Sequence, residues 1–158
     1  MRRFSPVELA IGFAVIGAVA AVAIPAFVRE LHASRFVEPV EGLQRIGASA
    51  VAYAEKNGRF PDSAPLTPAT PPRGKKEADP PGTWDTPAWK ALDFRPAPDG
   101  VPHAYAFSFA SDGASFVAQA RGDLDGDGVL STFEIRGSAR GGEPPQVAPG
   151  MYVEAELE

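Results

Sequence analysis

The hydrophobic pattern begins with an uncharged run from Leu9 to Val28, LAIGFAVIGAVAAVAIPAFV. At a rise of about 1.5 Å per residue, a helix of this length spans about 30 Å, which is the thickness of the hydrocarbon core of a bilayer. A soluble domain of this size has no need of a helix that is apolar on every face. The run therefore predicts a membrane-spanning helix over residues 9–28.

The helical pattern then continues in an amphipathic form over residues 29–58. Apolar and small residues recur at spacings of four and three, which places them on one face of a helix. These positions are Phe36, Val40, Leu43, Gly47, Ala50 and Ala54. Gly58 is well placed to end the helix in a left-handed conformation. We expect one long helix from about residue 5 to 56, loosened at Pro25 because proline removes a backbone donor, with its second half packed against a domain.

Residues 59–90 are rich in proline and have little periodicity, which is typical of an extended loop. Trp84, Trp89 and Leu92 are expected to anchor the far end of this loop on the core. Packing, rather than a platform for a ligand, is the expected role of both tryptophans.

Residues 91–158 contain the predicted strands. Three segments alternate apolar and polar residues, at 104–109, 115–120 and 132–136, and Asp112-Gly113 is a hairpin turn signal. A fourth short strand is expected at 91–94, and the acidic C-terminal end is either a last strand or mobile. The predicted fold class is therefore α+β, with one long N-terminal helix packed on a small antiparallel sheet of three or four strands.

Composition excludes several functions. The chain has 158 residues, no cysteine and a formal net charge of −5. It therefore has no disulfide, thiol nucleophile or thiolate metal site, and without a basic patch it is a poor candidate for binding nucleic acid. Its two histidines, His32 and His103, lack neighbours that mark a triad, a metal site or a phosphate loop. We expect a protein that is not an enzyme.

Several N-terminal motifs carry a family resemblance. The residues are Phe4-Ser-Pro-Val-Glu8, the apolar helix that follows, and Ala23-Ile24-Pro25; the segment from Tyr53 to Pro61 is similar to a pseudopilin helix exit. The chain thus resembles type IV pilins and type II secretion pseudopilins. The resemblance implies a pilin-like fold and a structural subunit that assembles with other pilin-like subunits through its N-terminal helix. It also implies that Phe4 begins the mature chain, Glu8 docks the subunit and Pro25 loosens the helix.

Two hypotheses remain open for the N-terminal end. The family's peptidase cuts after glycine, whereas Arg3 precedes Phe4 here. The alternative is an uncleaved anchor that holds an extracytoplasmic calcium-binding or adhesive module at the inner membrane. Residues 1–8 would then be a cytoplasmic cap, in which Ser5 and Glu8 form a capping box. In both cases the arginines before the apolar run predict a cytoplasmic N-terminus and a C-terminal domain in the periplasm or outside the cell.

The segment from Asp123 to Glu134 fits the calcium-loop pattern D-x-D-x-D-G-x5-E. A hard cation takes six to eight oxygen ligands. The candidate ligands are the side chains of Asp123, Asp125, Asp127, Ser131 and Glu134 and the carbonyl of Val129. Strand patterns, rather than helices, flank the loop, so the expected site is a strand–loop–strand calcium site. The other interpretation is an acidic hairpin turn, because Asp-Gly pairs are strong turn signals.

Overall fold

The computed structural model describes residues 5–139 and 143–155, and their side chains except at Leu9 and residues 28–35. The chain divides into two compact units, Met1–Phe36 and Val37–Glu158. The expected long helix is present as α1, Pro6–Asn57, which contains residues of both units. It continues through Pro25, and Gly58 follows it with a φ of 73°, as the sequence predicts for a residue that ends a helix.

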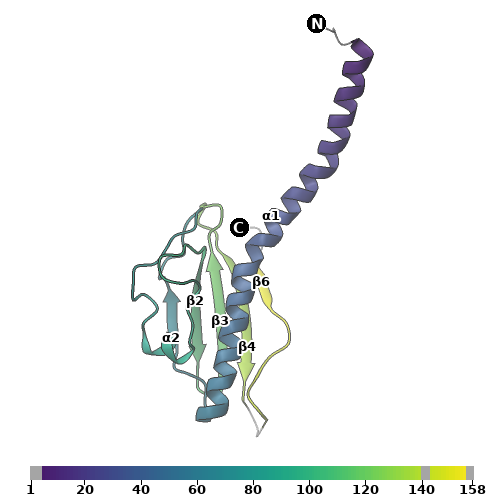
Figure 1. Cartoon of the computed structure of the whole chain (residues 1–158). Helices are drawn as coiled ribbons and strands as arrows, with labels where there is room; N and C mark the ends of the chain where they lie inside the picture. The colour runs from purple at the N-terminus through teal and green to yellow at the C-terminus, as the bar shows by residue number, and fades with distance from the viewer. Residues whose placement is uncertain (1–4, 140–142, 156–158) are drawn as a thin grey trace. The chain divides into compact units, whose positions relative to one another are not determined.

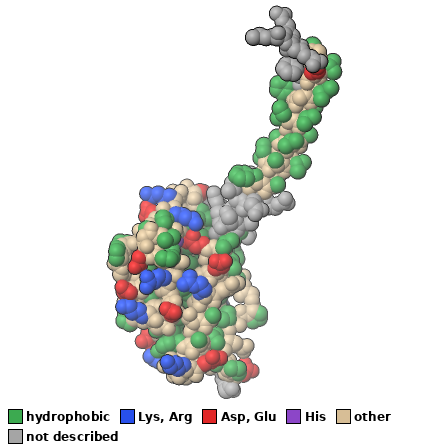
Figure 2. Space-filling model, in the orientation of Figure 1, with side chains coloured by type: hydrophobic (Ala, Val, Ile, Leu, Met, Phe, Trp, Pro, Cys, Tyr) green, Lys and Arg blue, Asp and Glu red, His purple; other side chains and the backbone are tan. Residues whose placement is uncertain are grey.

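The first unit contains a stretch of α1 that is suited to a membrane. Pro6–Phe27 has a mean hydropathy of 2.4, and by length and composition it is able to cross a bilayer. None of its described side chains is buried. Figure 2 shows hydrophobic side chains along the visible face of this stretch. The structure is thus consistent with a single-pass membrane anchor.

The second unit combines the C-terminal half of α1 with an antiparallel sheet of six strands, so the prediction of three or four strands was too low. The elements after α1 are β1 (Ala64–Thr67), α2 (Pro87–Ala91), β2 (Tyr105–Ser111), β3 (Ser115–Gly122), β4 (Ser131–Ser138), β5 (Gln146–Val147) and β6 (Tyr152–Glu154). The strand order is β1-β2-β3-β4-β5, and β6 also pairs with β4. Figure 1 shows the C-terminal half of α1 lying over one face of this sheet.

The three predicted central strands are correct, as is the turn between the first two. In β3 the buried residues Phe116, Ala118 and Ala120 alternate with half-buried ones, whereas β2 begins with three consecutive buried residues, Tyr105, Ala106 and Phe107. Asp112 closes the turn, because its Oδ1 accepts hydrogen bonds from the backbone of Ala114 and Ser115. Across the sheet, two alanines of β3 each lie between two large residues, in the rows Phe109–Ala118–Ile135 and Phe107–Ala120–Phe133.

This arrangement lets α1 approach the sheet closely. Leu43, Ile46, Ala50 and Ala54 of α1 are buried, so most of the predicted inward face is correct, although Ile46 was missed and Val40 is only half-buried. A Cβ atom at Gly42 would lie 2.5 Å from the ring of Phe107. Only glycine therefore fits there without displacing the aromatic core.

The segments around the sheet differ from the prediction in two places. Residues 91–94 are not a strand: α2 ends at Ala91, and Phe94 donates its backbone N–H to the carbonyl of Trp89 in the turn that follows. The proline-rich segment is not loop throughout, because it contains β1 and most of α2. Trp89 and Leu92 are fully buried, which confirms their predicted packing role. The C-terminal region forms β5 and β6, so the last-strand alternative was right.

Candidate functional site

The start of α1 has the reciprocal hydrogen bonds of a capping box. The backbone nitrogen of Ser5 donates to Oε2 of Glu8 at 2.7 Å, and the backbone nitrogen of Glu8 lies 3.2 Å from Oγ of Ser5. The Glu8 carboxylate thus accepts a hydrogen bond from the backbone at the start of its own helix. Phe4 lies outside the described residues, and Pro25 lies within the apolar stretch of α1.

The acidic loop between β3 and β4 brings three of the six candidate ligands together. Carboxylate oxygens of Asp123, Asp125 and Asp127 lie within 4.8 Å of one another. The first of these residues is buried and the other two are exposed. Such a group offers the oxygen ligands that a hard cation prefers.

Backbone hydrogen bonds support the shape of this loop. Oδ1 of Asp123 accepts from the nitrogen of Gly126 at 2.8 Å, and Oδ1 of Asp127 accepts from the nitrogen of Val129 at 2.7 Å. Gly126 and Gly128 have φ values of 85° and 97°. Residues other than glycine rarely adopt this backbone conformation. The loop geometry is therefore compatible with a turn as well as with a cation site.

Arg73, a residue that the sequence did not suggest, contacts the acidic loop. Its Nε donates to Oδ2 of Asp123 at 3.0 Å, and Asp123 is only 2% exposed. Burial by itself would raise the pKa of Asp123. Hydrogen bonds from Arg73 and from the backbone of Gly128 and Gly126, together with the charge of Arg73, outweigh burial and hold that pKa below its usual value.

The other three candidate ligands have different surroundings. Ser131 is buried at the start of β4, and its Oγ donates to the carbonyl of Gly122 at 3.2 Å. Val129 has an exposed side chain in the loop. Glu134 lies within β4 and accepts hydrogen bonds from Gln119 and Arg136.

Glu134 is a mostly buried carboxylate, with 8% of the residue exposed. Burial by itself would raise its pKa, but hydrogen bonds from Gln119 and Arg136 and the charges of Arg136 and Arg121 outweigh it. The pKa of Glu134 is therefore below its usual value. A cation at the loop would have to compete with these partners for the carboxylate.

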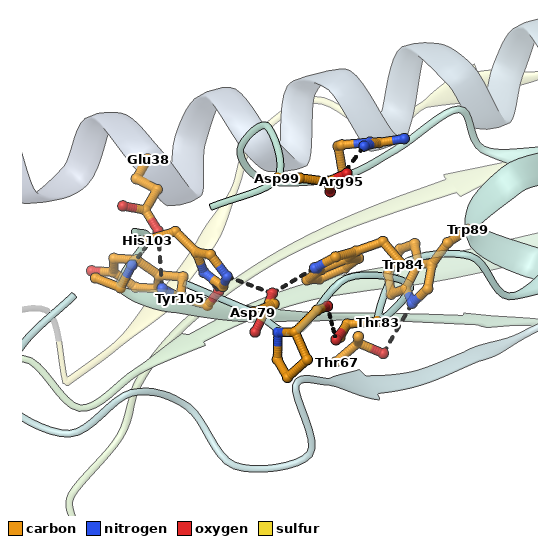
Figure 3. Close-up of polar contacts among 12 residues, drawn as sticks. Glu38, Thr67, Asp79, Thr83, Trp84, Trp89, Arg95, Asp99, His103 and Tyr105 are labelled. Carbon is orange, nitrogen blue, oxygen red and sulfur yellow. Dashed lines mark hydrogen bonds and ion pairs between the residues drawn. The ribbon is translucent and has the colours of Figure 1, made fainter. Parts of the chain in front are cut away.

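A second polar cluster, which the sequence did not predict, surrounds His103 (Figure 3). Nε2 of His103 lies 2.6 Å from Oδ2 of Asp79, and the same oxygen accepts from Nε1 of Trp84 at 2.6 Å. Trp89 donates from its indole nitrogen to Oγ1 of Thr67 at 2.9 Å. Both tryptophans thus use their indole N–H in internal hydrogen bonds, Trp89 fully buried and Trp84 half-buried. The side chain of His32 is outside those described.

Glu38 of α1 forms a third group of polar contacts. Its Oε1 accepts from the backbone nitrogens of Ala104 and Tyr105 at 2.7 and 2.9 Å. Its other oxygen lies 3.5 Å from Nζ of Lys76. These contacts fasten α1 to the first residue of β2. No local signal in the sequence marks them, because the partners lie far apart along the chain.

We compared the chain with protein-family models, curated proteins and solved structures, and found no match in any of the three.

Proposed function

We propose that the chain is a pilin-like structural subunit of a type IV pilus or a type II secretion pseudopilus. It is held in the inner membrane by Pro6–Phe27 and assembles with other pilin-like subunits through this part of α1. The globular unit lies on the periplasmic or extracellular side. The protein performs no catalysis in this role.

The observation that carries the proposal is that α1 combines an apolar stretch with a segment that packs on the sheet. One helix of 52 residues contains an exposed apolar stretch of 22 residues and, further on, the buried residues that pack on the sheet. A simple anchor needs only the apolar stretch, and a soluble domain needs only the amphipathic one. A subunit that assembles through a helix while displaying a folded domain needs both in one element.

The position of Glu8 also supports assembly. A charged side chain that enters the hydrocarbon region without a partner costs about 2.5–3.5 kcal/mol or more. If processing makes Phe4 the N-terminal residue, the α-amino group of a neighbouring subunit is a suitable partner for the Glu8 carboxylate. The capping box alone explains Glu8 only where the helix end remains at the membrane surface.

The deciding experiment is the intact mass of the protein recovered from membranes. A mass that begins at Phe4, with an added methyl group, supports a processed subunit. A mass that begins at Met1 supports the uncleaved anchor. The variant Arg3→Gly is the control, because it supplies the glycine after which the family's peptidase cuts and so reports whether that peptidase is active in the cells.

The grouping of Asp123, Asp125 and Asp127 favours a second candidate, a membrane-anchored calcium-binding module. Calcium would bind through these carboxylates, with the Val129 carbonyl, Ser131 and Glu134 completing the oxygen ligands after rearrangement. Such a site would stiffen the connection between β3 and β4. An adhesive role for the exposed unit is compatible with it.

The calcium candidate is tested by thermal unfolding of the full chain in detergent micelles. Millimolar calcium is expected to raise the Tm, and Asp125→Asn is expected to remove the increase. Asp62→Asn is the matched control, because Asp62 is an exposed aspartate whose partner is Arg59. A Tm that does not respond to calcium would exclude this candidate and leave the proposal for α1 intact.

A further inference from the structure

The segment between β5 and β6 arches away from the edge of β4. Val147 in β5 pairs with Gly137, and Tyr152 in β6 pairs with Glu134. Between these two pairs, residues 148–151 belong to no strand. Figure 1 shows the chain bowing away from β4 before it reaches β6. A cavity lies on each side of this segment, one toward α1 and one toward the opposite face of the sheet.

The cavity on the side of α1 is apolar and has a volume of about 630 Å³. Pockets that bind small molecules typically measure about 300–1,000 Å³ and are lined mainly by apolar side chains. Of the lining residues that the structure describes, Gln44 alone has a polar side chain. The apolar side chains that line the cavity are Val40, Ala48, Ile135, Val147 and Met151. The cavity is therefore suited to a hydrocarbon chain.

This cavity follows α1 as an open groove. Val40 and Ala48 are eight residues apart, which is about 12 Å along a helix. Ala48 is exposed and Val40 is half-buried, so the groove is open to solvent on the side of the helix. Met151 has an unbranched side chain that adapts to irregular shapes. An open groove of this length fits an extended alkyl chain.

The cavity on the other side of residues 148–151 has a volume of about 330 Å³ and contains Arg136. Gly150 and Met151 line both cavities, so the two meet at this segment. The side chain of Arg136 is 71% exposed, and its Nε donates to Oε1 of Glu134 at 2.6 Å. Its two terminal nitrogens donate no hydrogen bond to any residue in the described part of the chain. They are therefore available to an anionic group.

The charges around Arg136 favour an anion. The charges of Arg121 and Arg136 both act on the Glu134 carboxylate, so two guanidinium groups surround one carboxylate. Glu154, a further carboxylate of this sheet face, pairs with Thr132. Thr132 is four residues from Arg136, which is about 13 Å along a strand. An excess of positive charge therefore remains beside the two cavities.

We propose that this site binds a long-chain fatty acid. The alkyl chain lies in the groove along α1, and the carboxylate accepts hydrogen bonds from the terminal nitrogens of Arg136. A guanidinium group and a carboxylate fit each other, because two parallel N–H donors meet two oxygens. Burial of the alkyl chain supplies most of the affinity, and Arg136 selects an anionic head group over a neutral one.

The location of the ligand is tested on the full chain in nanodiscs of phosphatidylcholine. The probe is a palmitic acid analogue with a diazirine near the end of its alkyl chain. Light expels nitrogen from the diazirine, and the resulting carbene inserts into a nearby C–H bond. Mass spectrometry should find the probe on peptides that contain Ile135, Val147 or Met151. Labelling confined to Pro6–Phe27 would overturn the proposal, and it is the result expected if a second copy of the chain covers the groove.

A variant that fills the groove tests its role. Ala48→Trp places a large side chain in the groove from an exposed position of α1 and should remove the labelling at Ile135, Val147 and Met151. Ala52→Trp is the matched control, because Ala52 is also exposed on α1 and does not line the cavity. Labelling that survives Ala48→Trp would overturn the proposal.

The role of Arg136 is tested by competition with unlabelled palmitic acid and with hexadecanol, which has no charge. Arg136→Gln should weaken competition by the acid between about twofold and fivefold, the range of an exposed ion pair. Competition by the alcohol should not change. An equal effect on the two competitors would overturn the assignment of a fatty acid. None of these results depends on whether the chain is a processed subunit or a permanent anchor.

Discussion

The guanidinium of Arg73 donates a hydrogen bond from Nε to Oδ2 of Asp123 at 3.0 Å. The same contact is reinforced by the backbone, because the nitrogen of Gly74 donates to the carbonyl of Asp123 at 2.8 Å. A positive side chain thus binds the most buried carboxylate of the acidic loop. Arg73 supplies part of the charge compensation that a calcium ion would bring.

Arg73 balances the charge of the buried Asp123 carboxylate. Arg73→Gln should lower the Tm of the full chain in the absence of calcium, because the buried Asp123 carboxylate loses its charged donor. If the loop binds calcium, millimolar calcium should restore part of the loss. Arg59→Gln is the control, since Arg59 pairs with the exposed Asp62. An equal loss for Arg73→Gln with and without calcium would contradict a cation site at this loop.

Acid pH should destabilise the sheet unit through carboxylates with lowered pKa. Hydrogen bonds from the backbone and side chain of Ser115, and from the backbone of Ala114, lower the pKa of Asp112. The resulting stability is complete above the unfolded value of about 3.9 and is lost as the pH falls through the lower folded value. Acid unfolding, followed by tryptophan fluorescence, should begin as the pH falls below about 4 and depend less on pH in Asp112→Asn. An unchanged pH dependence in that variant would refute this assignment.

The close approach of α1 to the sheet predicts different effects at two glycines of the same helix. A Cβ atom at Gly42 meets the Phe107 ring at 2.5 Å, whereas one at Gly47 lies 3.0 Å from the ends of the Ile135 and Val147 side chains. Overpacking should make Gly42→Ala destabilising by about 1–3 kcal/mol. Both substitutions gain about 1 kcal/mol of helix propensity, so Gly47→Ala, whose Cβ meets only the ends of two side chains, should cost less than Gly42→Ala. Denaturant unfolding measures both, and equal effects would contradict the packing described.

The Glu38 contacts predict a specific loss at the start of β2. Glu38→Ala leaves the backbone nitrogens of Ala104 and Tyr105 without this acceptor and should cost about 1–3 kcal/mol. Glu41→Ala, at an exposed position of the same helix, should change the free energy of unfolding by no more than about 0.5 kcal/mol. Faster hydrogen exchange at the two nitrogens should accompany the first substitution only.

The sequence predicted the elements with strong periodicity. The twenty-residue apolar run, the amphipathic continuation and the three alternating strands all correspond to real elements, because each has a long apolar run or a regular apolar period. The strand expected at 91–94 was wrong because burial of Leu92 and Phe94 arises from α2 and its C-terminal turn. The signal for α2 was present, since Thr86-Pro87 is a helix N-cap followed by proline at the first position.

Other features had no local signal. The strand β1 has four residues with a proline among them, and β5 has two, so their pairing depends on partners elsewhere in the chain. The same is true of the contacts Arg73–Asp123, Glu38–Tyr105 and Asp79–His103, which join segments that only the fold brings together. The acidic loop was recognisable from its spacing, but the partners of Glu134 were set by its place within β4.

The capping and assembly roles of Glu8 predict opposite effects for two substitutions. Glu8→Gln keeps an acceptor for the Ser5 nitrogen and removes the charge, so it should preserve the helix but reduce assembly if the carboxylate pairs with a neighbouring amine. Ser5→Ala removes one capping hydrogen bond and keeps the charge, so it should leave assembly largely intact. The amount of filament, or of cross-linked oligomer in membranes, measures both. A stronger effect of Ser5→Ala would indicate a capping role alone.

The central claim is that subunits assemble through the apolar part of α1, and disulfide cross-linking in membranes tests it most directly. The chain has no cysteine, so Ile11→Cys combined with Val22→Cys, both at exposed positions of α1, introduces two unique sites. An open assembly should give a ladder of species larger than a dimer under oxidation, and the ladder should persist when the membrane is diluted with lipid. If oxidation gave only monomers and dimers, and the dimers were lost on dilution, the result would contradict the claim.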